Sequence, residues 1–199
     1  MRREIRPALS LVLLFTLVLG VALPAAFTGL AQAVLPFQAN GSLLERNGQI
    51  IGSALIGQSF AGPTWFTPRP SALTGTDAAG KTIATPYDAA ESGGSSSGPT
   101  NAGMIARVRS RIAAYRKTYG PGPVPDDAVT TSGSGLDPDI SLENALRQAP
   151  AIAAARKLPA ATVTALVNRL AAHRLFGVIG TDHVNVLKLN LALSRIGAP

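Results

Sequence analysis

Cysteine is absent from the 199-residue chain, and histidine occurs only twice. A chain without cysteine forms no disulfide, no thiolate metal site and no cysteine nucleophile. His173 and His183 do not stand in metal-ligand spacing with each other or with a nearby acid. Ser134, between two glycines, lacks the flanking pattern of a nucleophile elbow and an obvious histidine partner. We therefore expect no catalytic residue and no bound metal.

Acidic and aromatic residues are also scarce. The 11 acids are outnumbered by 18 Lys and Arg, which gives a net charge of +7, and aromatic residues make up 5% of the chain. Five basic residues surround one predicted helix with no aromatic side chain placed to stack on bases: Arg107, Arg109, Arg111, Arg116 and Lys117. This pattern excludes nucleic acid as a partner and favours a basic face that meets solvent, acidic lipid or a partner protein.

Charge is missing altogether from Pro7 to Leu44. Within this run, the apolar residues of 8–30 fall on every side of a helix, and about 20 such residues cross the roughly 30 Å hydrocarbon core of a membrane. A signal peptide, for which Ala31-Gln32-Ala33 offers a cleavage site, and a buried core helix are the alternatives. Signal peptides have apolar regions of about 7–15 residues, so the longer run favours an uncleaved anchor.

The charges that flank this run predict its orientation. Arg2, Arg3 and Arg6 stand directly before it, whereas the first charges after it are Glu45 and Arg46. The positive-inside rule then places residues 1–7 in the cytoplasm, residues 8–30 across the cell (inner) membrane, and residues 36–199 in an extracytoplasmic domain. Pro24 removes one hydrogen bond, which membrane helices tolerate.

The rest of the chain predicts one mixed α+β domain. We expect strands over 50–57 and 124–131, a long surface loop over 74–99, and a helix that begins at Thr100 or Asn101 and ends by Gly120. Ser141 is expected to cap a helix, Pro150 to open a second turn, and a helix after Pro159 to end near Gly177. Asn185 and Asn190, in the apolar tail, are expected to be turn or cap residues.

Two segments are open to a functional interpretation. In Ser132-Gly133-Ser134-Gly135 and the two residues before it, the glycine amides and the hydroxyls of Thr130, Thr131, Ser132 and Ser134 are suited to an anion. Asp137 and Asp139 are suited to orient a cation or a base. A simple strand-to-helix turn explains the same residues. Trp65 and Phe66 form either a ligand platform or, as we favour, a plug that fixes a loop to the core.

Five motifs in one order also resemble a known family, the C subunit of the Kdp-type potassium-transporting P-type ATPase. The resemblance covers nearly the whole chain. It is carried by Gly52 to Phe60 (GSALIGQSF), Trp65-Phe66 with Arg69-Pro70-Ser71-Ala72, Ser92-Gly93-Gly94-Ser95, Ser132 to Pro138 (SGSGLDP) and Val184 to Leu193 (VNVLKLNLAL).

The resemblance implies an accessory, non-catalytic subunit of an ATP-driven potassium uptake complex. Its implied partners are the ATP-hydrolysing and potassium-translocating subunits, besides membrane lipid, and its implied role is to hold them together and to raise the affinity for ATP. It implies no cofactor of its own, since ATP is bound by or with the partner. The residue it implies near the nucleotide is Gln148, in Gln148-Ala149-Pro150.

This chain departs from the family pattern at Asp139, where a histidine is usual, and at Trp65, where a tyrosine is usual. The topology also conflicts with a nucleotide contact, because it places Gln148 outside the cytoplasm while ATP is inside. With the domain outside, it would act at a distance, by holding the partner's membrane helices in one arrangement or by covering an ion entrance. A membrane-anchored enzyme that uses the SGSGLDP loop, and a tethered scaffold unrelated to transport, are the alternative functions.

Overall fold

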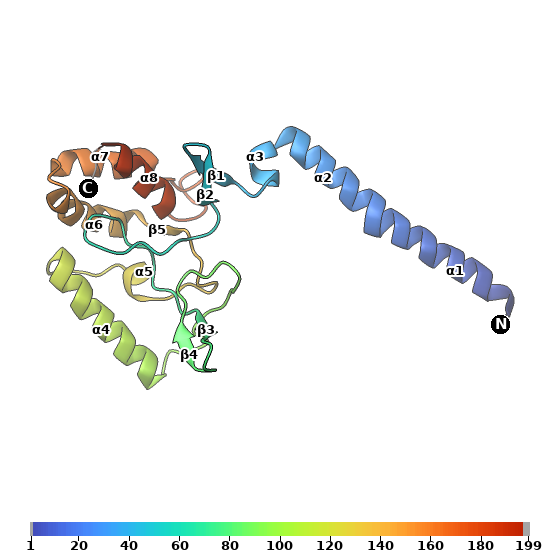
Figure 1. Cartoon of the computed structure of the whole chain (residues 1–199), viewed down its shortest axis with the longest axis horizontal. Helices are drawn as coiled ribbons and strands as arrows, with labels where there is room; N and C mark the ends of the chain where they lie inside the picture. The colour runs from blue at the N-terminus through green and yellow to red at the C-terminus, as the bar shows by residue number, and fades with distance from the viewer. Residues whose placement is uncertain (1, 197–199) are drawn as a thin grey trace. The chain divides into compact units, whose positions relative to one another are not determined.

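The computed structural model describes residues 2–196, and its internal contacts divide the chain into two units at Ser53/Ala54. The first unit begins with three helical segments: α1 (Arg2–Leu17), the π-helical turn η1 (Val18–Ala22) and α2 (Leu23–Val34) (Figure 1). Over Arg3–Val34 they form one 32-residue helix, whose most apolar 18-residue stretch has a mean hydropathy of 2.4 and no buried residue. This helix is long and apolar enough to cross a membrane, as the sequence predicted.

The π-helical turn has a local cause. The amide of Leu23 donates to the carbonyl of Val18, five residues back, and Pro24 follows directly. A proline ring collides with the carbonyl four residues before it, which here belongs to Gly20, inside the π-helical turn. The widened turn gives that ring room, so the helix continues through Pro24.

A short helix, α3 (Pro36–Ala39), and an antiparallel hairpin complete the first unit. The hairpin joins β1 (Leu43–Arg46) to β2 (Gln49–Ser53) through Asn47 and Gly48, both at positive φ. The strand expected over 50–57 was therefore too long, because it ends at Ser53. Its partner strand, β1, was not predicted from the sequence.

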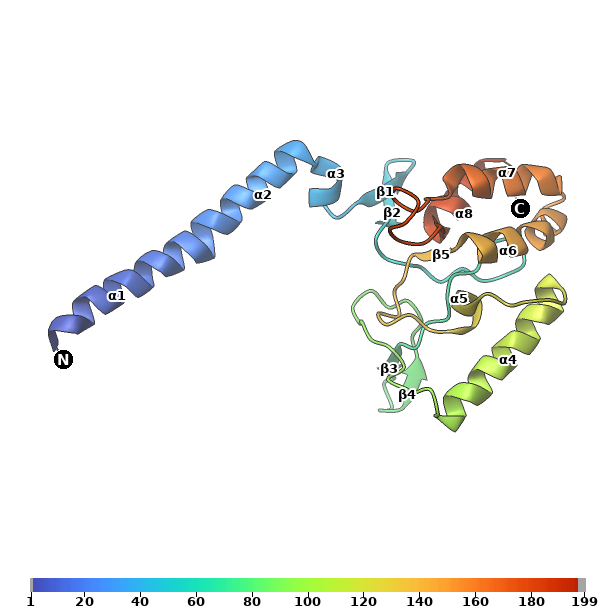
Figure 2. The ribbon, with the colours of Figure 1, turned by 180° about the vertical axis from the view of Figure 1, so that it is seen from behind.

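The second unit is the mixed domain. Its elements are β3 (Thr74–Thr76), β4 (Thr82–Ala84), α4 (Ala102–Tyr119), α5 (Asp126–Val129), β5 (Asp139–Ser141), α6 (Leu142–Ala155), α7 (Ala160–Leu170), β6 (His183–Asn185) and α8 (Val186–Ile196). The strands pair as two antiparallel ribbons, β3 with β4 and β5 with β6. In both views α6, α7 and α8 lie together, with α4 and the β3–β4 ribbon on the other side of α5 (Figures 1 and 2). The predicted α+β class is confirmed.

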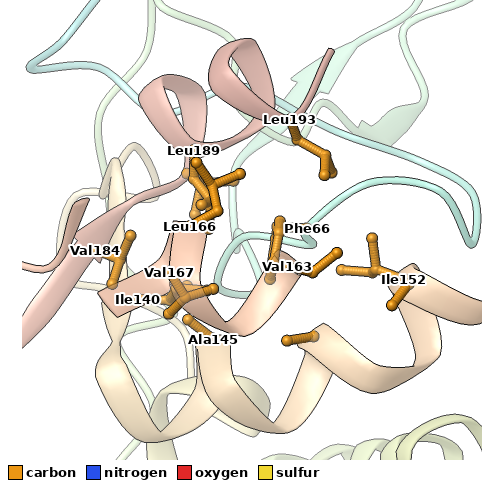
Figure 3. Packing of buried hydrophobic residues seen from close by; sticks show 13 residues of the cluster. Phe66, Ile140, Ala145, Ile152, Val163, Leu166, Val167, Val184, Leu189 and Leu193 are labelled. Atoms are coloured by element: carbon orange, nitrogen blue, oxygen red, sulfur yellow. The ribbon is translucent and has the colours of Figure 1, made fainter. Parts of the chain in front are cut away.

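The core lies where α6, α7 and α8 meet the β5–β6 ribbon. Figure 3 shows Phe66 from the preceding loop among side chains of all three helices, including Ile152, Val163 and Leu193. Phe66 is fully buried, so the plug interpretation is confirmed for this residue. Burial of one large apolar side chain stabilises a domain by about 2–3 kcal/mol.

Several predicted elements need correction. The loop over 74–99 contains the β3–β4 ribbon, and 124–131 contains the short helix α5 rather than a strand. Pro150 lies inside α6 instead of opening a new turn, and α7 ends at Leu170, well before Gly177. The helix capped by Asn101 and ended by Gly120 is confirmed as α4, and Ser141 caps α6.

Candidate functional site

The SGSGLDP turn holds itself together through its own side chains. Ser132 Oγ accepts from the amide of Gly135 at 2.9 Å, and Ser134 Oγ accepts from the amide of Leu136 at 3.1 Å. Asp137 Oδ1 accepts from the amide of Asp139 at 3.1 Å. The amide of Gly135, which was predicted to be available to an anion, therefore bonds to a hydroxyl of the turn itself.

The other motif segments converge on this turn. The amide of Gly57 donates to the carbonyl of Leu136 at 2.7 Å, and that of Gly93 donates to the carbonyl of Ser134 at 2.9 Å. Arg69 donates to Asp137 Oδ2 at 2.8 Å, in an ion pair whose side chains are about one quarter exposed. The motifs are thus joined by contacts that no single motif reveals.

Glycine is required where these segments touch. Gly135 has φ +70°, and a Cβ there would lie 2.6 Å from Leu73 Cγ and 3.0 Å from the carbonyl oxygen of Gly93. A Cβ at Gly57 would lie 2.6 Å from the carbonyl oxygen of Asp137. The two glycines therefore let three backbones approach one another.

Asp139 connects the turn to the end of the chain. Its Oδ1 accepts from Asn185 Nδ2 at 3.1 Å, and the same amide group donates to the carbonyl of Ala54 at 2.9 Å. Burial raises the pKa of Asp139, and the imidazole of His183, 3.9 Å away, partly lowers it. Asp137 and Asp139 also line a cavity of about 300 Å³ with Arg69 and His183.

Two buried carboxamides hold the loop that carries Phe66. Asn190 accepts from the amide of Phe66 at 2.9 Å and donates to its carbonyl at 3.0 Å. Gln148 accepts from the amide of Thr67 at 2.8 Å and donates to its carbonyl at 3.1 Å. We call Asn190 and Gln148 the carboxamide clamp, because each side chain binds a backbone residue as a neighbouring strand would.

A polar network continues from the clamp into α4 and α5. Asn144 Oδ1 accepts from Gln148 Nε2 and from the hydroxyl of Tyr115, both at 2.9 Å, and Asn144 Nδ2 donates to Asp127 at 3.0 Å. Asp127 also accepts from the amide and hydroxyl of Ser141. Burial raises the pKa of Tyr115, so its hydroxyl stays a donor. The network fixes α4 and α5 against α6.

The structure thus brings some predicted site residues together and separates another. Ser132, Gly133, Ser134, Gly135 and Asp137 form one turn, whereas Gln148 bonds to Thr67 and Asn144 instead of to that turn. Asn190, expected to be a turn or cap residue, lies buried within α8, so that expectation was wrong. Asn185 does cap α8, where it accepts from the amide of Lys188. The one sequence signal for its role in holding the Phe66 loop was that Asn190, a polar residue, stands among apolar ones.

Residues 2–196 contain no group of three His, Asp or Glu side chains that could hold a metal ion. The fold and the turn define a class of protein: a small α+β domain, organised around one polar turn, that follows a single apolar helix able to cross a membrane.

Comparison with known proteins identifies the family. The model of the KdpC family, described as K+-transporting ATPase, c chain, matches residues 5–195. The chain is 46% identical to the potassium-transporting ATPase KdpC subunit of Allorhizobium ampelinum, over 100% of this chain and 99% of the relative. It is 51% identical to that of Caulobacter vibrioides, over 97% and 93%. For Mycobacterium bovis the identity is 49%, over 98% and 100%.

The chain therefore belongs to the KdpC family, and the predicted resemblance is confirmed. It is a subunit of a potassium-transporting ATPase complex with a single-pass membrane anchor.

Proposed function

We propose that this chain is the accessory, non-catalytic subunit that holds the pump together, binding the ATP-hydrolysing and potassium-translocating subunits. The observation that carries the proposal is an exposed apolar hairpin in the second unit. The docking hairpin, residues 175–179, presents four large apolar side chains: Leu175 (58% exposed), Phe176 (86%), Val178 (78%) and Ile179 (61%).

The docking hairpin has a defined shape. The amide of Leu175 donates to the carbonyl of Ile179 at 2.9 Å, and the reverse bond is 3.0 Å. A second bridge, between Ala172 and His183, joins its base to β6. Two β-bridges therefore support the segment that presents these apolar side chains to solvent.

Folding alone does not account for this hairpin. Phe176 and Gly177 form its tip at φ +53° and +74°, and an aromatic residue in that region costs about 1 kcal/mol or more. At 86% exposure, Phe176 regains almost nothing from burial. Such a strained and exposed aromatic residue is typical of a binding anchor.

The surroundings of the hairpin suggest the nature of its partner surface. Arg174 directly precedes it and is exposed, and the His173 side chain, 65% exposed, lies 3.4 Å from the carboxylate of Asp182. We propose an apolar groove with a polar rim on another subunit of the same complex, since apolar interface centres carry polar rims.

Substitution at the hairpin tests this proposal. Phe176→Asn with Val178→Thr replaces the two most exposed apolar side chains of the docking hairpin with polar ones, and asparagine tolerates positive φ. We expect the pump subunits that co-purify with the full-length chain to fall roughly 30-fold, which corresponds to about 2 kcal/mol lost at an interface anchor. The melting temperature of the full chain should stay within about 2 °C of the wild-type value.

The matched control is Ile83→Thr, which removes an exposed apolar side chain from the β3–β4 ribbon. Full recovery of the partner subunits with the hairpin variant, or equal loss with the control, would contradict docking through residues 175–179.

For topology, we propose the arrangement that the charges predict, with residues 1–7 in the cytoplasm, 8–30 in the inner membrane and 36–199 outside the cytoplasm. The support is the basic N-terminal flank of the apolar helix. In this arrangement ATP binds the partner subunit, and this chain raises ATP affinity at a distance by favouring one conformation of the partner.

Labelling with a membrane-impermeant maleimide tests the topology. Ser96 is exposed and the natural chain has no cysteine, so Ser96→Cys creates a unique site. We expect labelling in intact cells. Protection in intact cells, with full labelling after lysis under denaturing conditions, would place the domain in the cytoplasm.

A further inference from the structure

Two arginines of α4 face a cavity that contains no acid. Arg107 and Arg111 are four residues apart, and both line a cavity of about 260 Å³ together with Ser95, Ser97, Thr130 and Thr131. A second cavity of about 300 Å³ shares Ser95, Arg107, Arg111 and Thr131 with the first. Neither cavity is lined by Asp or Glu within the described part of the chain.

The proximity of the two positive charges on Arg107 and Arg111 is electrostatically unfavourable. Like charges at this helical spacing repel each other. Within residues 2–196, no ion pair joins either guanidinium to a carboxylate, and their bonds go to Ser97 Oγ at 3.4 Å from Arg107 and to the carbonyl of Val129 at 3.0 Å from Arg111. Burial, and then the charge of Arg107, lowers the pKa of Arg111. An anion between the two guanidinium groups would offset both their mutual repulsion and the lowered pKa of Arg111.

The groups around the cavity match a tetrahedral oxyanion. Two guanidinium groups supply charge-assisted donors, and the hydroxyls of Ser95 and Thr131 add neutral donors. The hydroxyls of Ser97 and Thr130 line the same cavity but donate to the carbonyls of Ser95 at 3.2 Å and Asp126 at 2.7 Å. Of the hydroxyls that were predicted to bind an anion, those of Thr130 and Thr131 line this cavity, and Thr131 supplies the donor.

We propose that Arg107 and Arg111, with the hydroxyls of Ser95 and Thr131, form a binding site for a phosphate group. A phospholipid headgroup and a free phosphate share this chemistry. The site is separate from the docking hairpin, and the proposal does not depend on that surface.

The test uses the full-length chain in nanodiscs of phosphatidylcholine, with or without phosphatidylglycerol. Unfolding is followed by the fluorescence of Trp65, the one tryptophan of the sequence, while inorganic phosphate is added to the phosphatidylcholine discs. We expect phosphate, or phosphatidylglycerol in its place, to raise the melting temperature of the wild-type chain. For the variant R107Q/R111Q, we expect an apparent affinity at least roughly tenfold weaker.

The control variant, R109Q/K117Q, removes two exposed charges from the same helix and leaves the cavity intact. Stabilisation by phosphate in phosphatidylcholine discs identifies a free phosphate ligand, and stabilisation by phosphatidylglycerol alone identifies a lipid headgroup. Two results would overturn the site: no response of the wild-type chain to either probe, or equal losses in R107Q/R111Q and R109Q/K117Q.

Discussion

Replacing Asn190 with alanine should lower the free energy of unfolding of the second unit by about 4 kcal/mol. The side chain is 1% exposed, and both the amide and the carbonyl of Phe66 depend on it. Each buried backbone group left without a partner costs about 1–3 kcal/mol, and the lost volume adds a cavity beside Phe66. Domains of this size are stable by about 5–15 kcal/mol, so the loss is a large share of the total.

Urea unfolding of the full-length chain in detergent, followed by Trp65 fluorescence, measures this loss. With a slope of about 2 kcal/mol per molar, the midpoint should fall by about 2 M. Asn168→Ala is the matched control, because Asn168 is exposed on α7 and its removal should change stability by less than about 0.5 kcal/mol. A midpoint for Asn190→Ala equal to that of the control would show that the clamp does not hold the Phe66 loop.

Local signals were sufficient for parts of this fold. The uncharged run predicted the membrane helix, and Asn101, the apolar spacing and Gly120 predicted α4 almost to its ends. Both helices could be predicted because their signals, the apolar pattern and the capping residues, lie within the helix itself or at its ends. Short ribbons such as β3–β4 have too few residues for a periodic pattern, so they were read as loop.

The clamp could not be predicted for a different reason. Asn190 and Phe66 are 124 residues apart, and their contact leaves no periodic pattern in the sequence. The alternating leucines from Leu187 to Leu193 also concealed that this tail is helical. The Arg107–Arg111 pair was hidden similarly, because arginines four residues apart are typical of a solvated helix face and nothing in the sequence places Ser95 and Thr131 beside them.

Gln148 has two candidate roles, which are to hold the loop of Phe66 or to contact the nucleotide. Its Nε2 donates to the carbonyl of Thr67 and to Asn144, and its Oε1 accepts from the amide of Thr67. Both donor hydrogens are engaged and the residue is 1% exposed, so a nucleotide contact would require breaking these bonds. We therefore propose that Gln148 positions the loop of Phe66 and does not bind ATP.

Gln148→Met keeps the length of the side chain but removes every hydrogen bond, and it should destabilise the full chain by about 3 kcal/mol. A domain of this size loses about 3 °C in melting temperature for each kcal/mol, so we expect a fall of about 9 °C. Pumps that assemble with the variant should keep the wild-type KM for ATP, since the partner holds the nucleotide. A KM raised severalfold at an unchanged melting temperature would instead assign Gln148 to the nucleotide. Because Asn190 and Gln148 hold adjacent residues, the double variant should lose less stability than the sum of the two single losses.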